Sequence, residues 1–210
     1  MEILTSKKKM TTKQKKKRLL IIGGISLVAI IAIVAVVFFT LDRTGVIDRV
    51  FATSITLSSP APVEATNKEN IVLDAIVTRL PDGEYLAASL SVYFDHNRLE
   101  FIGVRQGTMR TVGINGNYSI PIWNSDVEAA NRTGVINTMY LDMTGGDHPY
   151  IVDDADILLR LAFRLRDSAQ SGDTLYVTIE DAIFATVDPA DAVAMTKGNL
   201  IGFNAQIIVE

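Results

Sequence analysis

The side chains that could carry out chemistry are sparse in this chain of 210 residues. It has no cysteine, which excludes thiol nucleophiles, disulfides and cysteine-based zinc sites. The two histidines, His96 and His148, lie in turn-like sequence without a G-x-S-x-G or H-E-x-x-H motif around them. A catalytic triad or a zinc site needs more converging partners, so we predict no catalytic histidine.

Paired carboxylates raise the alternative of a glycosidase, which needs an acid and a second carboxylate across the sugar. The candidate pairs are Asp95 with Glu100, and Glu180 with Asp181. In turns, aspartate commonly accepts hydrogen bonds from nearby backbone N–H groups, and strand carboxylates commonly face solvent. We favour these structural roles and predict that the chain is not an enzyme.

Three acidic loops concentrate oxygen atoms that a calcium ion could use. They are Gly145-Gly146-Asp147, Asp153-Asp154-Ala155-Asp156 and Asp188-Pro189-Ala190-Asp191. Calcium takes about six to eight oxygen ligands, and acidic loops are usually only solvated. We therefore predict no metal and no cofactor, with calcium as the alternative.

The formal charge of −4 conceals a strong asymmetry. Residues 1–18 hold seven Lys, one Arg and one Glu, a balance of +7, so the remaining residues carry −11. Charge divided in this way indicates two compartments. The acidic part would repel phosphates, which argues against nucleic acid as a partner.

A long uncharged segment, Leu19–Phe39, follows the basic residues. At about 1.5 Å per residue its roughly 21 residues span about 30 Å, the thickness of a bilayer core. A cleaved signal peptide is the alternative, but this run is longer than a usual apolar signal region, and no small-x-small cleavage site follows it. We predict an uncleaved transmembrane helix over 19–40 in contact with membrane lipid.

Orientation follows from the charges beside this segment. Basic residues cluster before it, whereas only Arg43 and Arg49 come soon after it. The positive-inside rule then predicts a cytoplasmic tail at 1–18, a juxtamembrane linker at 41–53 and an extracellular domain at 54–210. The expected location is therefore the cell membrane, crossed once.

The domain alternates apolar and polar residues with a period of two, which is typical of half-buried strands. Turn signals such as Pro81-Asp82-Gly83 separate the runs, and only Asp126–Ala130 suggests a helical turn. The predicted strands are 54–58, 71–77, 86–94, 99–104, 117–123, 135–141, 157–165, 175–179, 182–186 and 201–209. This pattern predicts an all-β fold, an antiparallel β-sandwich of about nine or ten strands.

Aromatic side chains offer a possible sugar-binding platform. Tyr93 and Tyr140 each lie one position out of phase with apolar neighbours, Val92/Phe94 and Met139/Leu141. Both are therefore expected to face solvent, where their rings could stack on a sugar. Ordinary cross-strand packing is the favoured interpretation.

Three stretches taken together resemble the cohesin family of jelly-roll sandwich modules, which is related to carbohydrate-binding modules. In Leu86–Val104 a strand runs into a turn of the family's Y/F-D-x-x-x-L-E type. Gly134–Ala185 is similar to the family's strand, acidic-glycine loop, alternating strand and D-A-x-F-A strand. Lys197–Ile201 resembles the small turn before the last strand. The resemblance covers Ser54–Glu210 and implies a jelly-roll binding module without catalysis.

Cohesins hold dockerins, which are calcium-dependent partners carried by enzymes. The resemblance implies partner contacts at Ala87 and Ser89, where dockerin-binding cohesins typically carry Asn and Asp, and near Met143, where they carry an acidic residue. With Tyr93 and Tyr140 these positions form the predicted partner-binding set. The leading hypothesis is a membrane-anchored module that engages a protein partner. The alternatives are a module that binds polysaccharide and a structural subunit of an envelope assembly.

Overall fold

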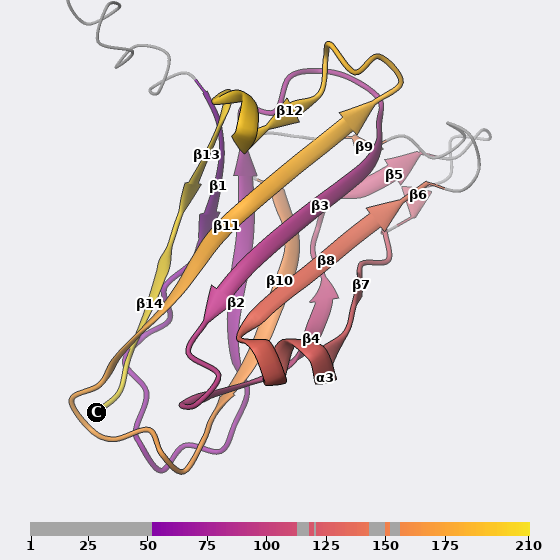
Figure 1. Cartoon of the computed structure of the whole chain (residues 1–210). Coiled ribbons are helices and arrows are strands. Elements are labelled where there is room, and N and C mark those ends of the chain that lie inside the picture. The colour runs from indigo at the N-terminus through magenta and orange to yellow at the C-terminus, as the bar shows by residue number, and fades with distance from the viewer. Residues whose placement is uncertain (1–51, 113–117, 120, 143–149, 152–155) are drawn as a thin grey trace, which may run out of the picture. The chain divides into compact units, whose positions relative to one another are not determined.

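The computed structural model describes residues 52–112, 118–119, 121–142, 150–151 and 156–210 (Figure 1). The chain divides after residue 50 into a first part and a second unit, Phe51–Glu210. Only the second unit contains described residues, so the predicted anchor from Leu19 to Phe39 lies outside them and stays a prediction. No helix in the described ranges has the length and apolar character to cross a bilayer.

Two β-sheets make up the Phe51–Glu210 unit. The first has the order β13 (Leu200–Phe203), β1 (Thr53–Leu57), β2 (Ile71–Thr78), β10 (Asp156–Leu165), β4 (Leu99–Gln106). The second has the order β12 (Val193–Ala194), β11 (Thr174–Thr186), β3 (Tyr85–Phe94), β9 (Tyr150–Ile151), β5 (Arg110–Val112), β6 (Tyr118–Ser119). Beside this path, β14 (Ala205–Ile208) pairs with β11, β8 (Val135–Leu141) pairs with β3, and β7 (Asn124–Ser125) pairs with β8. Two short helices, α3 (Val127–Thr133) and the 3₁₀ turn η1 (Met195–Lys197), complete the described elements.

The two sheets pack face to face and bury their alternating side chains between them. Figure 1 shows β11, β3 and β8 side by side as one layer, with β2 and β10 in the layer behind. Phe94 of β3 meets Phe163 of β10 with ring centroids 5.3 Å apart, and Phe101 of β4 lies 5.6 Å from Phe163. All three rings are fully buried. This aromatic cluster therefore joins the layers, and the unit holds a core made of its own residues.

The C-terminal strand belongs to both sheets. Its β13 part pairs in parallel with β1, and its β14 part pairs antiparallel with β11. Asn204 lies between the two parts, and its Oδ1 accepts a hydrogen bond from the Ile179 backbone N–H at 3.0 Å. Beside it, a Cβ placed on Gly202 would come within 3.0 Å of the Ile179 side chain, so glycine lets the two layers approach here.

The edge strand β4 is closed by one asparagine side chain from α3. Asp126 caps this helix by accepting from Ala129 N, and Gly134 ends it in a left-handed conformation with φ 77°. From the helix, Asn131 Oδ1 accepts from Phe101 N at 2.8 Å and its Nδ2 donates to Phe101 O at 2.7 Å. The amide thus takes the place of a neighbouring strand, which leaves that part of the edge unavailable for pairing with another chain.

The sandwich, the helical turn at the start of α3 and most strand positions confirm the sequence prediction. Four details differ from it. Of the strand predicted over 117–123, the structure shows only β6, and residues 121–123 form no strand. β13 pairs in parallel with β1, whereas an antiparallel sandwich was predicted, because the last strand crosses from one sheet to the other. The runs predicted at 175–179 and 182–186 are one strand, β11, interrupted by a register shift between Ile179 and Asp181. The single strand predicted over 201–209 is divided at Asn204.

Replacing Asn131 with alanine should destabilise the unit by about 1–3 kcal/mol, because the buried backbone N–H and C=O of Phe101 lose their partners. Asn124→Ala, at an exposed position of β7, is the control and should change the free energy of unfolding by less than about 0.5 kcal/mol. Urea denaturation of both variants measures the difference. Equal stability of the two variants would contradict the edge-closing role.

Candidate partner-binding face

The second sheet exposes one broad surface, formed by the solvent-facing side chains of β11, β3 and β8, which we call the outer face. In Figure 1 no element of the described chain lies over these three strands. Strand register arranges the outward residues in rows across the sheet. The rows are Thr178–Tyr93–Val135, Asp181–Ser91–Asn137, Ile183–Ser89–Met139 and Ala185–Ala87–Leu141.

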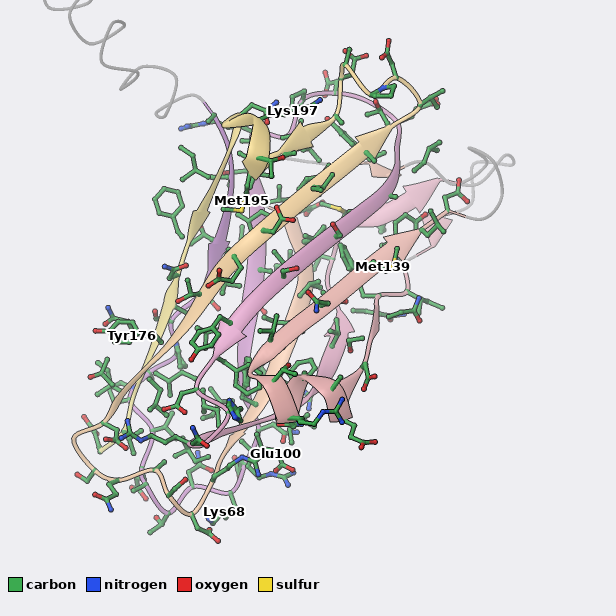
Figure 2. The ribbon with its side chains drawn as sticks, viewed as in Figure 1. Lys68, Glu100, Met139, Tyr176, Met195 and Lys197 are labelled. Atoms are coloured by element: carbon green, nitrogen blue, oxygen red, sulfur yellow. The ribbon has the colours of Figure 1, made fainter. Side chains whose placement is uncertain are left out.

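One end of the outer face is apolar or small. Met139 and Leu141 of β8 are 48% and 49% exposed, and Figure 2 labels Met139 on this strand. Ala87 and Ser89 of β3 lie beside them, with Ile183 and Ala185 of β11 on the other side. We call these six residues the apolar end. Ala87 and Ser89 are smaller than Met139, Leu141 and Ile183 beside them, so a partner's side chain can approach the sheet there.

The other end of the outer face is aromatic and acidic. Tyr93 of β3 is 47% exposed, and Tyr176 of β11, which Figure 2 labels, is 54% exposed. The register shift in β11 is a β-bulge, which places two successive residues opposite one partner residue. As a result Glu180 and Asp181 both lie on the solvent side, between buried Ile179 and buried Ala182. We call Tyr93, Tyr176, Glu180 and Asp181 the acidic end.

The predicted partner-binding residues fall in different places. Ala87, Ser89 and Tyr93 all lie on the outer face, and Tyr93 faces solvent as expected. The same expectation for Tyr140 is wrong, because Tyr140 is 7% exposed and its ring packs 6.5 Å from that of Trp123. Pairing with Ala88 of β3 turns Tyr140 inward and turns Met139 and Leu141 outward. Met143 lies outside the described residues.

Several residues of the outer face escaped the sequence-based selection. Tyr176 is the clearest case, since it alternates with buried Leu175 and Val177 and the strand period alone places it outside. Met139 and Leu141 are apolar, and apolar character in a strand favours burial, so the sequence does not indicate that they face solvent. The position of Glu180 depends on the bulge, for which the sequence gives no signal that we recognise.

The remaining chemical candidates take structural roles. Asp95 Oδ1 accepts from Asn97 N at 3.0 Å, as its expected role in the turn requires, and Glu100 lies 3.8 Å from Arg164 Nη1. His96 contributes its backbone carbonyl, which accepts from Arg166 Nε. His148 lies outside the described residues.

The acidic loops show no metal site within the described ranges. No group of three or more His, Cys, Asp or Glu side chains there could hold a metal ion. In the loop Asp188–Asp191, Asp188 Oδ1 accepts from Ala190 N at 2.8 Å. The loops at 145–147 and 153–155 lie outside the described residues.

An acidic pocket of about 550 Å³ lies where the loop before β3 meets the loop after β11. Its lining includes the four carboxylates of Asp82, Glu84, Asp188 and Asp191. Burial raises the pKa of the neighbouring Tyr85 phenol, and Asp191 and Asp82 add to the rise. Lys197, at the same end of the unit, directs its ammonium to the carbonyls of Pro189 and Ala192 at 2.7 and 3.3 Å (Figure 2).

Comparison with known proteins shows what fold this is. No family model and no curated protein matches the sequence. Among solved structures, the third ScaC cohesin of Acetivibrio cellulolyticus, solved in complex with the ScaB dockerin, matches with a TM-score of 0.56 and 15% identity. That match covers 75% of this chain and 98% of the cohesin. The fold is cohesin-like.

Two further cohesins support the assignment. The cohesin of the Coh-OlpC–Doc435 complex from Clostridium thermocellum matches with a TM-score of 0.55 and 14% identity, over 76% of this chain and 94% of its own. The seventh ScaB type I cohesin of Pseudobacteroides cellulosolvens gives 0.53 and 12%, over 76% and 92%. Each match therefore covers nearly a whole cohesin-like domain, which agrees with the resemblance found in the sequence.

Stability of this cohesin-like unit should fall above pH 10. Burial, with help from Asp142, raises the pKa of the Tyr140 phenol from 10.0 to about 12. Between these values the unfolded chain has lost the phenol proton that the folded chain keeps. The folded state then binds more protons, so the free energy of unfolding decreases as the pH rises.

Urea unfolding between pH 9 and 11.5 measures this decrease. Tyr140→Phe should make it less steep, because the variant lacks the phenol that the fold keeps protonated. Tyr93→Phe, at a position that is 47% exposed, is the control and should leave the slope unchanged. Identical slopes for the parent and Tyr140→Phe would contradict the burial of Tyr140.

Proposed function

We propose that this chain is a non-catalytic, cohesin-like binding module that holds a protein partner on the outer face. One observation carries the proposal: Met139 and Leu141 are about half exposed on a sheet face that no described element covers. Exposed apolar side chains grouped on one face, next to polar ones, are characteristic of protein-interaction sites. The cohesin-like fold supports it, since solved cohesins of this fold are held in complexes with dockerins.

The apolar end determines the kind of contact that we propose. Where dockerin-binding cohesins typically present Asn and Asp, this face presents Ala87 and Ser89, flanked by Met139 and Ile183. Burial of apolar surface contributes roughly 25 cal/mol per Å², so most of the binding free energy should come from Met139 and Leu141. The partner is accordingly a dockerin-type protein whose contact surface is more apolar than polar.

We also propose that the module works at the cell surface. The support comes from the sequence: the basic segment at 1–18 precedes an uncharged segment of membrane-spanning length, and the positive-inside rule directs the following domain outward. A short linker over 41–53 then keeps the module near the bilayer. The anchor itself contacts membrane lipid.

The polysaccharide alternative lacks the exposed aromatic row on which it depends. It required Tyr93 and Tyr140 to form an exposed aromatic row, and Tyr140 is buried against Trp123. The envelope-subunit alternative has no observation of its own in the described residues.

Affinity capture on the immobilised Phe51–Glu210 unit tests the proposal, with extracts of the native cells supplied with calcium. The parent unit should enrich a protein that carries a dockerin-type sequence. Met139→Asp with Leu141→Asp should reduce its recovery at least tenfold, because both charges fall within the contact. Phe203→Asp, at a 51% exposed position of the first sheet, is the matched control and should retain the protein.

Two outcomes would contradict this function. One is that the parent unit enriches no protein over a bare matrix. The other is that the Met139→Asp, Leu141→Asp variant recovers the same protein as fully as the parent does.

A further inference from the structure

The outer face is distinguished from the rest of the unit by its charge. Strands β11, β3 and β8 contain no Lys and no Arg, and their acidic residues are Glu180 and Asp181. In the first sheet, by contrast, arginine side chains meet carboxylates across strands, as in Arg160 with Asp74 at 2.9 Å. The outer face is therefore an anionic surface without a counter-charge of its own.

The two carboxylates of the acidic end have no partner within the described chain. Neither takes part in a hydrogen bond or an ion pair among the described residues, whereas Asp74, Glu100 and Asp173 each lie next to an arginine. The bulge places both carboxylates outward. Asn204 stabilises the start of this bulge, because its Oδ1 accepts a hydrogen bond from the Ile179 backbone N–H. Two like charges are thus held next to each other on one strand.

Two tyrosines flank Thr178, Tyr93 on the neighbouring strand close to Glu180 and Tyr176 on the side away from it. Thr178 occupies the centre, with Tyr93 directly opposite it on β3. Tyr176 and Glu180 lie two residues away from Thr178 on either side along β11, about 7 Å in each direction by strand geometry. Directly opposite side chains lie about 5 Å apart, so Tyr93 is within reach of the same point. The small Thr178 side chain is therefore surrounded by two exposed rings and a carboxylate.

We propose that the acidic end binds a cationic side chain of the protein partner, an arginine in preference to a lysine. The proposal rests on the proposed function and adds the chemistry of the partner to it. A guanidinium group above Thr178 meets the carboxylate of Glu180 and stacks on a tyrosine face, and the charge of Asp181 in the next row adds to the attraction. A lysine ammonium meets the same charges but lacks the planar group that stacks.

The two ends of the outer face then have separate roles. Contact at the apolar end is insensitive to salt, since it depends on burial of Met139 and Leu141. Contact at the acidic end orients the partner and speeds its approach, and it weakens as salt is added. A neutral sugar stacked on Tyr93 and Tyr176 is the competing occupant, and it would show neither charge preference nor salt dependence.

A titration followed by NMR tests the inference without a known partner. The probe is N-acetyl-arginine amide, and N-acetyl-citrulline amide is its neutral isostere. Arginine amide should shift the signals of Tyr93, Tyr176, Glu180 and Asp181 with an apparent affinity at least tenfold above that of citrulline amide. Raising sodium chloride from about 20 to 200 mM should lower the affinity for arginine amide several-fold.

Variants assign the binding to the acidic end. Glu180→Gln with Asp181→Asn should lower the affinity for N-acetyl-arginine amide at least fivefold. Asp188→Asn with Asp191→Asn removes the same charge from the acidic pocket and should change the affinity less than twofold. Met139→Asp with Leu141→Asp should preserve the preference for arginine over citrulline, because the apolar end does not hold the cation.

Three results would overturn the inference: equal shifts with arginine and citrulline amides, shifts confined to the pocket loops, or stronger shifts of both tyrosines with cellobiose. A failed affinity capture together with a clear arginine preference would overturn the proposed function alone. Successful capture without that preference would overturn this inference alone.

Discussion

The hydrogen bond between Asn204 and the Ile179 backbone marks the constraint on which the architecture depends: one C-terminal strand serves both sheets. To leave β1 and join β11, the chain must give up backbone pairing at the crossing point. The Asn204 side chain replaces one of the lost bonds, so that the buried N–H keeps a partner. Gly202 brings the layers close enough at this point for the crossing to be short.

This crossing also shapes the surface that we propose to be functional. The bulge in β11 begins next to the bond from Asn204, in the gap between the pairing of β14 and that of β12. Through the bulge, two carboxylates come to lie on the face that carries Tyr93 and Tyr176. On the other side of β3, the uninterrupted pairing with β8 places Met139 on the same face. The bulge beside the strand crossing at Asn204 thus produces the acidic end of the outer face, next to the apolar end.

The alternation of apolar and polar residues predicted the features that depend only on neighbouring residues in the sequence. It placed β8 at 135–141, predicted the sandwich and put Tyr93 outside. It failed at Tyr140, because β8 is apolar on both sides and only its register with β3 decides which side is buried. The bulge and the division at Asn204 were missed for a similar reason, since both arise from pairing between segments that are distant in sequence. The anchor remains a prediction, because residues 1–51 lie outside the described chain.

Photo-cross-linking in the native cells tests the central claim, that the outer face is the surface that holds the partner. A photoreactive amino acid replaces Met139 in one full-length variant and Phe203 of the first sheet in another, positions that are 48% and 51% exposed. The proposed arrangement predicts one discrete protein adduct from position 139 and none from position 203. An adduct from position 203 alone, or the same adduct from both positions, would contradict it.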